Sequence, residues 1–376
     1  MKKYLMTPGP VPVSREVSLA GARQLIGHRG REFSELFSGI EVKLSRLLRS
    51  GGPTVIFPSS GTGALESLAV NFTGPDTKVI SVSCGEFGGR FREIVALTGA
   101  EIVNVDVAAG EGVEPAVVAD AVKAYPDASV LLLTQNETST GVFNHIDEII
   151  ASLPGNNRPL VLVDGVSSVG AMPCFPEEWG IDGLATASQK GLLTPPGLGL
   201  VWLSERGWGA VSKRKSPSYY FDLIRQKRDM DKEAPENPYT PPVSLYFALD
   251  AALDEILADG WFDLRARAAR ALTAGIEALG FTLLVKDAKF RSTGVTAFYH
   301  SSGATQEIAK NLKAMGIEPA GGQGKLKGKL IRMSHYHDVR WPEISLTLGG
   351  LYAALGEARS SAGDFMRSAF EAWEAK

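Results

Sequence analysis

Short runs of apolar residues alternate with stretches of helical periodicity through the first half of the chain. The stretch 33–48 carries apolar side chains three and four positions apart, which predicts an amphipathic helix. Apolar strands that alternate with helices predict a mainly parallel sheet covered on both faces. The expected strands are 55–57, 78–83, 101–105, 130–134, 160–163, 183–186 and 199–203, and the expected helices between them are 63–72, 90–98, 115–124 and 146–153.

Proline and glycine interrupt this pattern on both sides. Residues 7–12 contain three prolines, which exclude a helix and predict an extended arm. The polar, proline-bearing segment 213–242 predicts a surface excursion that reaches a partner subunit. From Val243 a helical pattern runs to about Leu279, and Asp259–Gly260 is its expected break.

The chain from Phe281 onward predicts a smaller domain of the α+β type. Its expected strands are 295–299 and 329–334, and its expected helices are 305–315 and 341–357. We therefore predict an α/β protein with a large domain, 15–245, whose mainly parallel sheet is sandwiched by helices. Residues 1–14 and 246–376 are expected to supply an N-terminal arm and the smaller C-terminal domain.

Composition is that of an ordinary globular protein, with 376 residues, 44% hydrophobic and 22% charged. A formal net charge of -3 gives no reason to expect nucleic acid or a membrane surface as partner. The start of the chain is broken by Pro8, so we expect no signal peptide, and no apolar run approaches the roughly 20 residues of a membrane span. With only two cysteines, these features predict a cytoplasmic protein.

A lysine and an aspartate follow two of the expected strands. Asp164 ends the run 160–163, and Lys190 comes directly after 183–186 and before a Pro/Gly turn. Ligands of parallel sheets bind at the carboxyl ends of the strands, where both residues fall. Pyridoxal phosphate needs such a pair: the lysine forms a Schiff base with the aldehyde, and the carboxylate keeps the pyridine nitrogen protonated. A surface charge is the usual role of a lysine, so this interpretation needs support elsewhere in the chain.

Three turns and one strand offer that support. The segment 58–64 places hydroxyls and glycines at a helix start, which suits a phosphate group or a simple helix cap. Phe87, flanked by glycines, can stack on a flat ring or fill the core. The hydroxyl cluster 136–141 can bond a cofactor ring hydroxyl or a substrate, or is ordinary loop chemistry. Arg332, between apolar neighbours, suits a substrate carboxylate or a structural ion pair.

Two further motifs are set aside. The glycine- and lysine-rich segment 321–329 lacks the spacing of a P-loop, since Gln323 stands where a glycine is needed. His335, His337 and Asp338 have no second cluster to complete a metal site, so we expect no metal.

Taken together and in this order, these segments resemble the class V aminotransferases of fold type I, and above all the alanine–glyoxylate, serine–glyoxylate and serine–pyruvate aminotransferases. The resemblance covers nearly the whole chain and rests on segments 7–10, 27–29, 60–66, 137–141, 188–190, 239–245 and 321–324, with Asp164, Ser167, Ser168 and Arg332. It implies the fold of type I pyridoxal-phosphate transferases, pyridoxal 5'-phosphate as cofactor, and a homodimer with a shared active site.

The resemblance also implies roles for single residues. Lys190 is then the Schiff-base lysine that moves the proton at the substrate Cα, and Asp164 pairs with the pyridine nitrogen. Arg332 matches the clamp of the substrate α-carboxylate. The matches to cofactor contacts are Val166 under the ring, Phe87 stacked on it, Thr138 beside its oxygen, Ser60, Gly61, Thr62 and Gln189 at the phosphate, and Thr240 at the phosphate of the neighbouring subunit. Some relatives have a phosphate-binding tyrosine where this chain has Asn237.

The implied reaction is a ping-pong transfer of an amino group from alanine or serine to glyoxylate or pyruvate. Aminoethylphosphonate, ureidoglycine and aspartate remain alternative donors, and phosphoserine transaminases share the fold. A cysteine desulfurase would need a mobile cysteine in the C-terminal third, but none follows Cys174. A non-catalytic subunit of a larger complex is the alternative from a different class.

Overall fold

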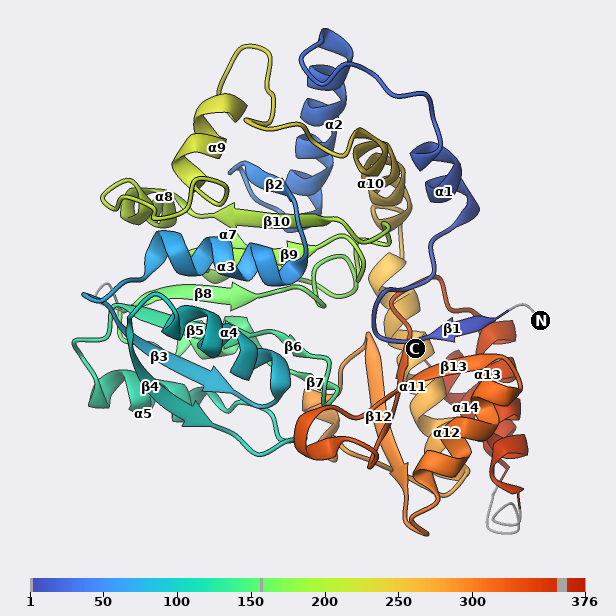
Figure 1. The fold of residues 1–376 in the computed structure, drawn as a ribbon. Coiled ribbons are helices and arrows are strands. Elements are labelled where there is room, and N and C mark those ends of the chain that lie inside the picture. The colour runs from blue at the N-terminus through green and yellow to red at the C-terminus, as the bar shows by residue number, and fades with distance from the viewer. Residues whose placement is uncertain (1–2, 156–157, 357–363, 376) are drawn as a thin grey trace.

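The computed structural model describes residues 3–155, 158–356 and 364–375. Its larger sheet has seven strands and its smaller sheet has five (Figure 1). In spatial order the larger sheet contains β2 (Thr54–Pro58), β10 (Leu198–Leu203), β9 (Gly183–Ala187), β8 (Leu160–Asp164), β5 (Val130–Thr134), β3 (Lys78–Ser83) and β4 (Glu101–Asp106). β10 runs antiparallel to β2 and β9, and the other neighbours are parallel, which confirms the prediction of a mainly parallel sheet.

Helices flank this sheet and connect its parallel strands. α3 packs on β9 and β10, and α4 packs on β3 and β5. The helices of this part of the chain are α1 (Arg15–Gly21), α2 (Arg31–Leu48), α3 (Gly61–Phe72), α4 (Glu86–Ala96), α5 (Pro115–Ala124), α6 (Ile146–Ala151), α7 (Pro176–Trp179), α8 (Glu205–Val211), α9 (Leu223–Met230) and α10 (Val243–Ile256). A short hairpin, β6 (Asn136–Glu137) with β7 (Val142–Phe143), leaves the carboxyl end of β5.

The smaller sheet orders its strands as β1 (Tyr4–Met6), β13 (Ile317–Gly321), β14 (Ile331–Ser334), β12 (Val295–His300) and β11 (Phe281–Leu283). Its helices are α11 (Trp261–Ala278), α12 (Thr305–Ala314), α13 (Trp341–Ala354) and α14 (Phe365–Glu374), with 3-10 turns at Ala288–Phe290 and Gly324–Leu326. The expected α+β character of this part is confirmed. The predicted helix end at residue 357 lies outside the described residues.

Two hydrophobic cores follow the two sheets. The buried hydrophobic side chains of α10 belong to the core of the larger sheet. In α11, Trp261 still belongs to that core, whereas Ala268, Ala271, Leu272 and Ile276 belong to the second core. Gly260, with a φ of +76°, separates the two helices at the break expected from the sequence. We propose that each of the two hydrophobic cores defines one domain. The boundary expected at 245/246 falls inside α10, so the junction that we propose lies after Ile256.

The N-terminal arm links the two sheets. β1 pairs in parallel with β13 of the smaller sheet. Beyond β1 the expected extended arm bends at residues 8–10, where the Thr7 hydroxyl donates to the carbonyl of Pro10 at 3.0 Å. The Val11 N–H then donates to the carbonyl of Gln189, 3.2 Å away, beside the larger sheet. Ser334 Oγ donates to the carbonyl of Thr7 at 2.7 Å from the other side. The arm therefore lies between the two cores, next to the carboxyl end of β9 (Figure 1).

In the part of the chain that the structure describes, every helix is too short or too polar to span a membrane.

Candidate active site

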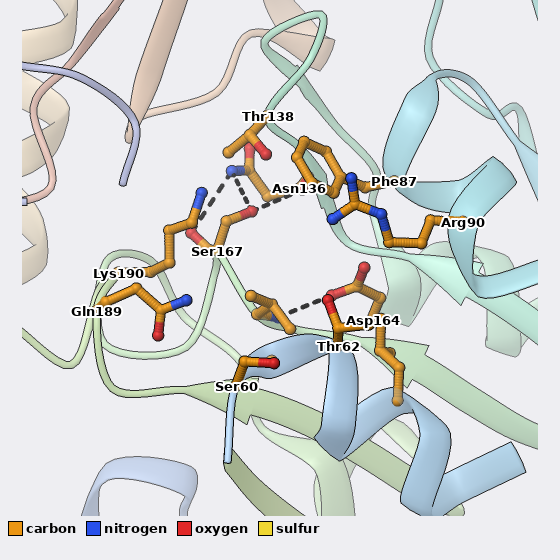
Figure 2. Close-up of a pocket in the computed structure, with 13 residues that line it drawn as sticks. Ser60, Thr62, Phe87, Arg90, Asn136, Thr138, Asp164, Ser167, Gln189 and Lys190 are labelled. Carbon is orange, nitrogen blue, oxygen red and sulfur yellow. Dashed lines mark hydrogen bonds between the residues drawn. The ribbon is translucent and has the colours of Figure 1, made fainter. Parts of the chain in front are cut away.

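One pocket opens at the carboxyl ends of the central strands and brings together all the predicted cofactor contacts except Thr240. It holds about 490 Å³ of space, including the part open to solvent. Figure 2 shows Lys190 and Gln189 on one side of this pocket, Phe87 and Arg90 on the other, and Asp164 and Ser60 below. The lining residues are Ser60, Gly61, Thr62, Leu65, Phe87, Arg90, Asn136, Thr138, Asp164, Val166, Ser167, Gln189 and Lys190.

Asp164, the last residue of β8, forms the floor of the pocket and is only 4% exposed. Its Oδ1 accepts a hydrogen bond from the Val166 backbone N–H at 2.9 Å. Burial raises the pKa of this carboxyl to about 7, because the anion is desolvated, while the charges of Lys190 and Arg90 act in the opposite direction. A cation brought to Asp164 would restore the charged form.

Lys190 stands in the turn between β9 and β10. Burial, together with the positive charge of Arg332, lowers the pKa of its amine to about 8. Its Nζ lies 5.7 Å from the centroid of the Phe87 ring. An amine with this pKa is partly neutral near pH 7, so it can act as nucleophile and as base.

The start of α3 forms the side of the pocket that suits a phosphate. Ser60 is the N-cap residue of α3, and its Oγ accepts from the Gly63 N–H at 3.4 Å. A Cβ at Gly61 would lie 2.8 Å from Val166 Cγ1, so only glycine lets α3 approach this close. The first turn contains no acidic residue, and the hydroxyls of Ser60 and Thr62 flank its free N–H groups. This is the arrangement of an anion site at a helix N-terminus.

Arg332 projects from β14 of the smaller sheet and is 5% exposed. Its Nε donates to the carbonyl of Gly321 at 2.8 Å, and its Nη1 donates to the carbonyl of Thr138 at 2.7 Å. The second contact fixes the guanidinium beside the pocket, although Arg332 does not line it. The geometry is consistent with a carboxylate clamp whose orientation the backbone sets in advance.

Four pocket residues were not predicted as site residues: Leu65, Arg90, Asn136 and Ser167. Arg90 lies three positions after Phe87 on α4, on the same helix face, and its guanidinium carbon lies 4.8 Å from the centroid of that ring. Asn136 donates to Ser167 Oγ and to Tyr336 Oη, both at 2.9 Å. The helical spacing could have indicated Arg90, whereas the contact with Tyr336 joins residues far apart in sequence.

Thr240 lies away from the pocket of its own chain and is exposed. Asn237, which stands in place of a tyrosine, is turned into the core. Its Nδ2 donates to the carbonyl of Ile56 at 3.0 Å, and its Oδ1 accepts from the Tyr246 hydroxyl at 2.9 Å. A side chain held in this way has a structural role within its own chain and is not available to a neighbouring phosphate.

The residues of the pocket fit pyridoxal phosphate. Asn136 is 2% exposed, and its Oδ1 has no hydrogen-bond partner among the described residues, as is also true of Gln189 Oε1. Unpaired acceptors of this kind are costly unless a ligand or water satisfies them. Asp164 suits a protonated ring nitrogen, Phe87 suits the ring face and Lys190 suits an aldehyde.

One of the two histidines considered for a metal forms hydrogen bonds within its own domain. His335 bonds Thr296 Oγ1 at 3.0 Å and the carbonyl of Thr293 at 2.7 Å. Within the described ranges, three or more His, Cys, Asp or Glu side chains nowhere gather in a way that could hold a metal ion.

Comparison with known proteins agrees with this geometry. The chain is 33% identical to a protein of Synechococcus sp. named soluble hydrogenase, small subunit, over 95% of this chain and 94% of that one. It is 32% identical to the L-aspartate–glyoxylate aminotransferase of Paracoccus denitrificans, over 88% of this chain and 85% of that one. An aspartate aminotransferase of subgroup IV from Thermus thermophilus has the same fold, with a TM-score of 0.86 at 31% identity, and the match covers 94% of this chain and 99% of that one.

The family model described as aminotransferase class-V matches residues 15–338, which is most of the chain. The pocket described above and the strands of the larger sheet lie within that match. The chain therefore belongs to the class V aminotransferases, the transaminases of fold type I that use pyridoxal phosphate.

Proposed function

We propose that this aminotransferase takes the amino group of alanine or serine and passes it to glyoxylate or pyruvate in a ping-pong cycle. The observation that carries the proposal is the pairing of Lys190 and Asp164 in one pocket with Arg332 fixed beside it: an amine with a lowered pKa, a buried carboxylate and a fixed guanidinium. These three groups are what transamination of an amino acid requires.

When bound, pyridoxal phosphate supplies an electron sink for the charge that develops at the substrate Cα. In the proposed mechanism Asp164 would keep the ring nitrogen protonated, because its negative charge would raise the pKa of that nitrogen. The protonated ring would lower the energetic cost of the negative charge that develops at the substrate Cα. Lys190 would move the proton between the substrate Cα and the aldehyde carbon of the cofactor. Phe87 and Val166 would contact the ring, and the residues that would hold the phosphate are Ser60, Gly61, Thr62 and Gln189.

Arg332 binds the α-carboxylate and so places Cα next to the Lys190 amine. Its two backbone contacts remove the freedom of the side chain before the substrate arrives, which lowers the entropic cost of binding. A small donor such as alanine or serine has no second charged group, so this single clamp satisfies it. Glyoxylate and pyruvate present the same carboxylate in the second half of the cycle.

Aspartate is the second candidate donor, and three observations favour it. The Paracoccus denitrificans relative is an L-aspartate–glyoxylate aminotransferase, and the Thermus thermophilus structure is an aspartate aminotransferase. Arg90 also lines the pocket and could offer a second cation to a dicarboxylic acid. The same relative supports glyoxylate as the acceptor.

A spectral half-reaction separates these candidates. Purified protein loaded with pyridoxal phosphate is mixed with alanine, serine or aspartate alone, and the visible absorption of the lysine-bound cofactor is followed. We expect rapid bleaching with alanine or serine. Bleaching by aspartate alone would transfer the proposal to the second candidate. Failure to bind the cofactor would favour the alternative of a non-catalytic subunit of a larger complex; the Synechococcus sp. relative is named as a subunit.

We further propose that the enzyme is a homodimer in which Thr240 reaches the phosphate site of the partner. Its support is the exposure of Thr240 together with the neighbouring aromatic surface. Tyr239 stacks on Tyr220 with ring centroids 4.9 Å apart, and the Tyr220 hydroxyl donates to the carbonyl of Pro58, next to the start of α3.

A further inference from the structure

A buried carboxylate outside the pocket holds one of its walls. Glu137 is fully buried and does not line the pocket. Its Oε2 accepts from the backbone N–H groups of Phe87 and Gly88, each at 3.0 Å. Its Oε1 accepts from the backbone N–H of Ser139 at 3.0 Å and from the Ser139 hydroxyl at 2.6 Å. All four contacts place a donor on the carboxylate and favour its charged form, in opposition to burial, which raises the pKa of Glu137.

Two of these contacts supply the cap that α4 lacks locally. The N-cap residue of α4 is Gly85, which has no side chain to accept from the first turn. The free N–H groups of a helix start need partners, and a negative charge there also interacts favourably with the helix dipole. Glu137 meets the N–H groups of Phe87 and Gly88, while Ser139 Oγ accepts from the Glu86 N–H at 3.1 Å. The cap therefore comes from a turn about fifty positions later in the chain.

The fit between the two segments leaves no spare room. A Cβ at Gly85 would lie 2.5 Å from Glu137 Cγ and 2.5 Å from Ser139 Oγ. The first turn of α4 is thus pressed onto the turn 137–139 as well as hydrogen-bonded to it. Phe87 is itself one of the bonded residues, so its backbone position depends on this contact.

The same turn also organises the opposite side of the pocket. Thr138, between the two bonding residues, lines the pocket, and its carbonyl accepts from Arg332 Nη1. One turn therefore fixes the stacking ring through α4 and orients the guanidinium through the carbonyl of Thr138.

We propose that Glu137 is a positioning residue for the cofactor ring: its buried carboxylate caps α4 from a distance and so holds the side chain of Phe87 over the pocket. Glu137 touches neither cofactor nor substrate in this role. Its effect reaches the reaction through Phe87.

The first test is made without cofactor. Hydrogen–deuterium exchange of the apoprotein follows the first turn of α4, which contains the amides of Phe87 and Gly88. In Glu137→Ala we expect exchange of this turn to be faster by about tenfold or more, since two capping bonds are lost. In Glu137→Gln an amide oxygen can still accept from both N–H groups, so exchange should stay closer to that of the unaltered protein. Unchanged exchange in Glu137→Ala would overturn the proposal.

The second test uses the loaded enzyme and asks whether Glu137 acts through Phe87. Glu137→Ala and Phe87→Leu are each expected to lower kcat/KM by about tenfold and to weaken the circular dichroism of the bound cofactor. The double variant should then be little worse than the more affected single variant, because both changes remove the same ring position. If the reductions of kcat/KM in the two single variants multiplied in the double variant, Glu137 would act independently of Phe87 and the proposal would fail.

Glu41 provides a matched control. It is a partly buried carboxylate that accepts from the Thr54 N–H at 3.2 Å, away from the pocket. Glu41→Gln is expected to alter stability without changing exchange in α4 or the dichroism of the cofactor. If Glu137→Ala does not fold, Ser139→Ala makes the same test, since it removes the partner of the Glu86 N–H and one donor to Glu137.

Discussion

The backbone of Gly9 lies directly on the side chain of Lys190. A Cβ built at Gly9 would stand 2.6 Å from Cε and 2.9 Å from Nζ of the lysine, closer than real Cβ contacts allow. Hydrogen bonds on either side of Gly9, from Val11 to Gln189 and from Ser334 to Thr7, hold the arm in this place. The N-terminal arm is therefore a wall of the active site that confines the lysine side chain.

Gly9→Ala is expected to lower kcat/KM strongly. The added methyl group must displace either the arm or the Lys190 amine, and a misplaced reacting group can cost about 100-fold in rate. The φ of +150° at Gly9 adds to the cost for any L side chain. Steady-state kinetics of the loaded enzyme give the measurement. Gly39→Ala, on α2 with nothing within 4 Å of its new Cβ, is the control and should leave kcat/KM unchanged.

Lys190→Ala is expected to abolish transamination and the visible absorption of the lysine-bound cofactor while the protein still folds. Loss of a general base alone costs about 10²–10⁴-fold, and here the same residue is also the proposed attachment point. The measurement is single-turnover kinetics, with thermal unfolding as a check of the fold. The matched control is Lys213→Ala, because Lys213 is exposed and lies outside the pocket. Retained turnover in Lys190→Ala would sink the assignment.

Arg332→Lys is expected to raise KM for the amino donor by about tenfold, since a single ammonium cannot reproduce the planar fork of the guanidinium. Affinity for the cofactor should change much less, because Arg332 bonds the carbonyls of Gly321 and Thr138 and does not line the pocket. Arg265→Lys is the control in the same part of the chain: Arg265 is buried and bonds the carbonyl of His337, so we expect lower stability without a selective rise in KM. An equal loss of cofactor affinity in Arg332→Lys would show that Arg332 is structural.

The rate at which the apoprotein attaches pyridoxal phosphate should follow the titration of Lys190. Only the neutral amine attacks an aldehyde, and burial places the pKa of Lys190 at about 8. Because the pKa is lowered, the neutral form accumulates as pH rises toward 8 and is nearly complete by about pH 9. Over the same range Asp164, whose pKa is raised to about 7, becomes an anion that can pair with the ring nitrogen.

Stopped-flow attachment of the cofactor between pH 6 and 10 measures this profile. The matched reaction of pyridoxal phosphate with a lysine model peptide removes the contribution of the cofactor's own titration. A rate that levels off near pH 9 in the protein and keeps rising in the peptide is the expected result. A profile that follows the peptide up to pH 10 would contradict the lowered pKa of Lys190.

Local sequence patterns predicted well the strands and helices that position the site. β3, α5 and β5 have the bounds expected from periodicity, and Asp164 and Lys190 lie at strand ends as predicted. Each strand of a buried parallel sheet is a nearly continuous run of apolar residues, and the carboxyl ends of these strands lie at one edge of the sheet. The pairing of a carboxylate and a lysine there follows from the fold class alone.

The prediction of helices was incomplete where residues distant in sequence, or a charged sequence that resembles a loop, determine the helix. The helix expected at 90–98 begins at Glu86, because Glu137 and Ser139 supply its cap across the sheet edge. The start of α4 is rich in glycine, so local propensity placed it too late. The segment 213–242 contains α9, which the side chain of Asp222 caps by accepting from the Arg225 N–H at 3.1 Å, although its charged sequence resembles a loop. Neither the distant cap nor the contact of Gly9 with Lys190 has a signature within a short window of sequence.

Thr240 allows a test of the shared active site that does not depend on seeing the dimer. Thr240→Ala removes one proposed hydrogen bond to the phosphate, so we expect the affinity for pyridoxal phosphate to fall by about tenfold.

Heterodimers of a Thr240→Ala chain and a Lys190→Ala chain are then isolated with two different tags. If Thr240 acts across the interface, the Lys190 of the first chain receives the intact Thr240 of the second, and half of the sites bind cofactor and turn over normally. If Thr240 acts within its own chain, every heterodimer site is defective and the affinity stays low. Heterodimers of Lys190→Ala with the unaltered chain set the level for one intact site, and failure of the two tags to purify together would contradict the dimer itself.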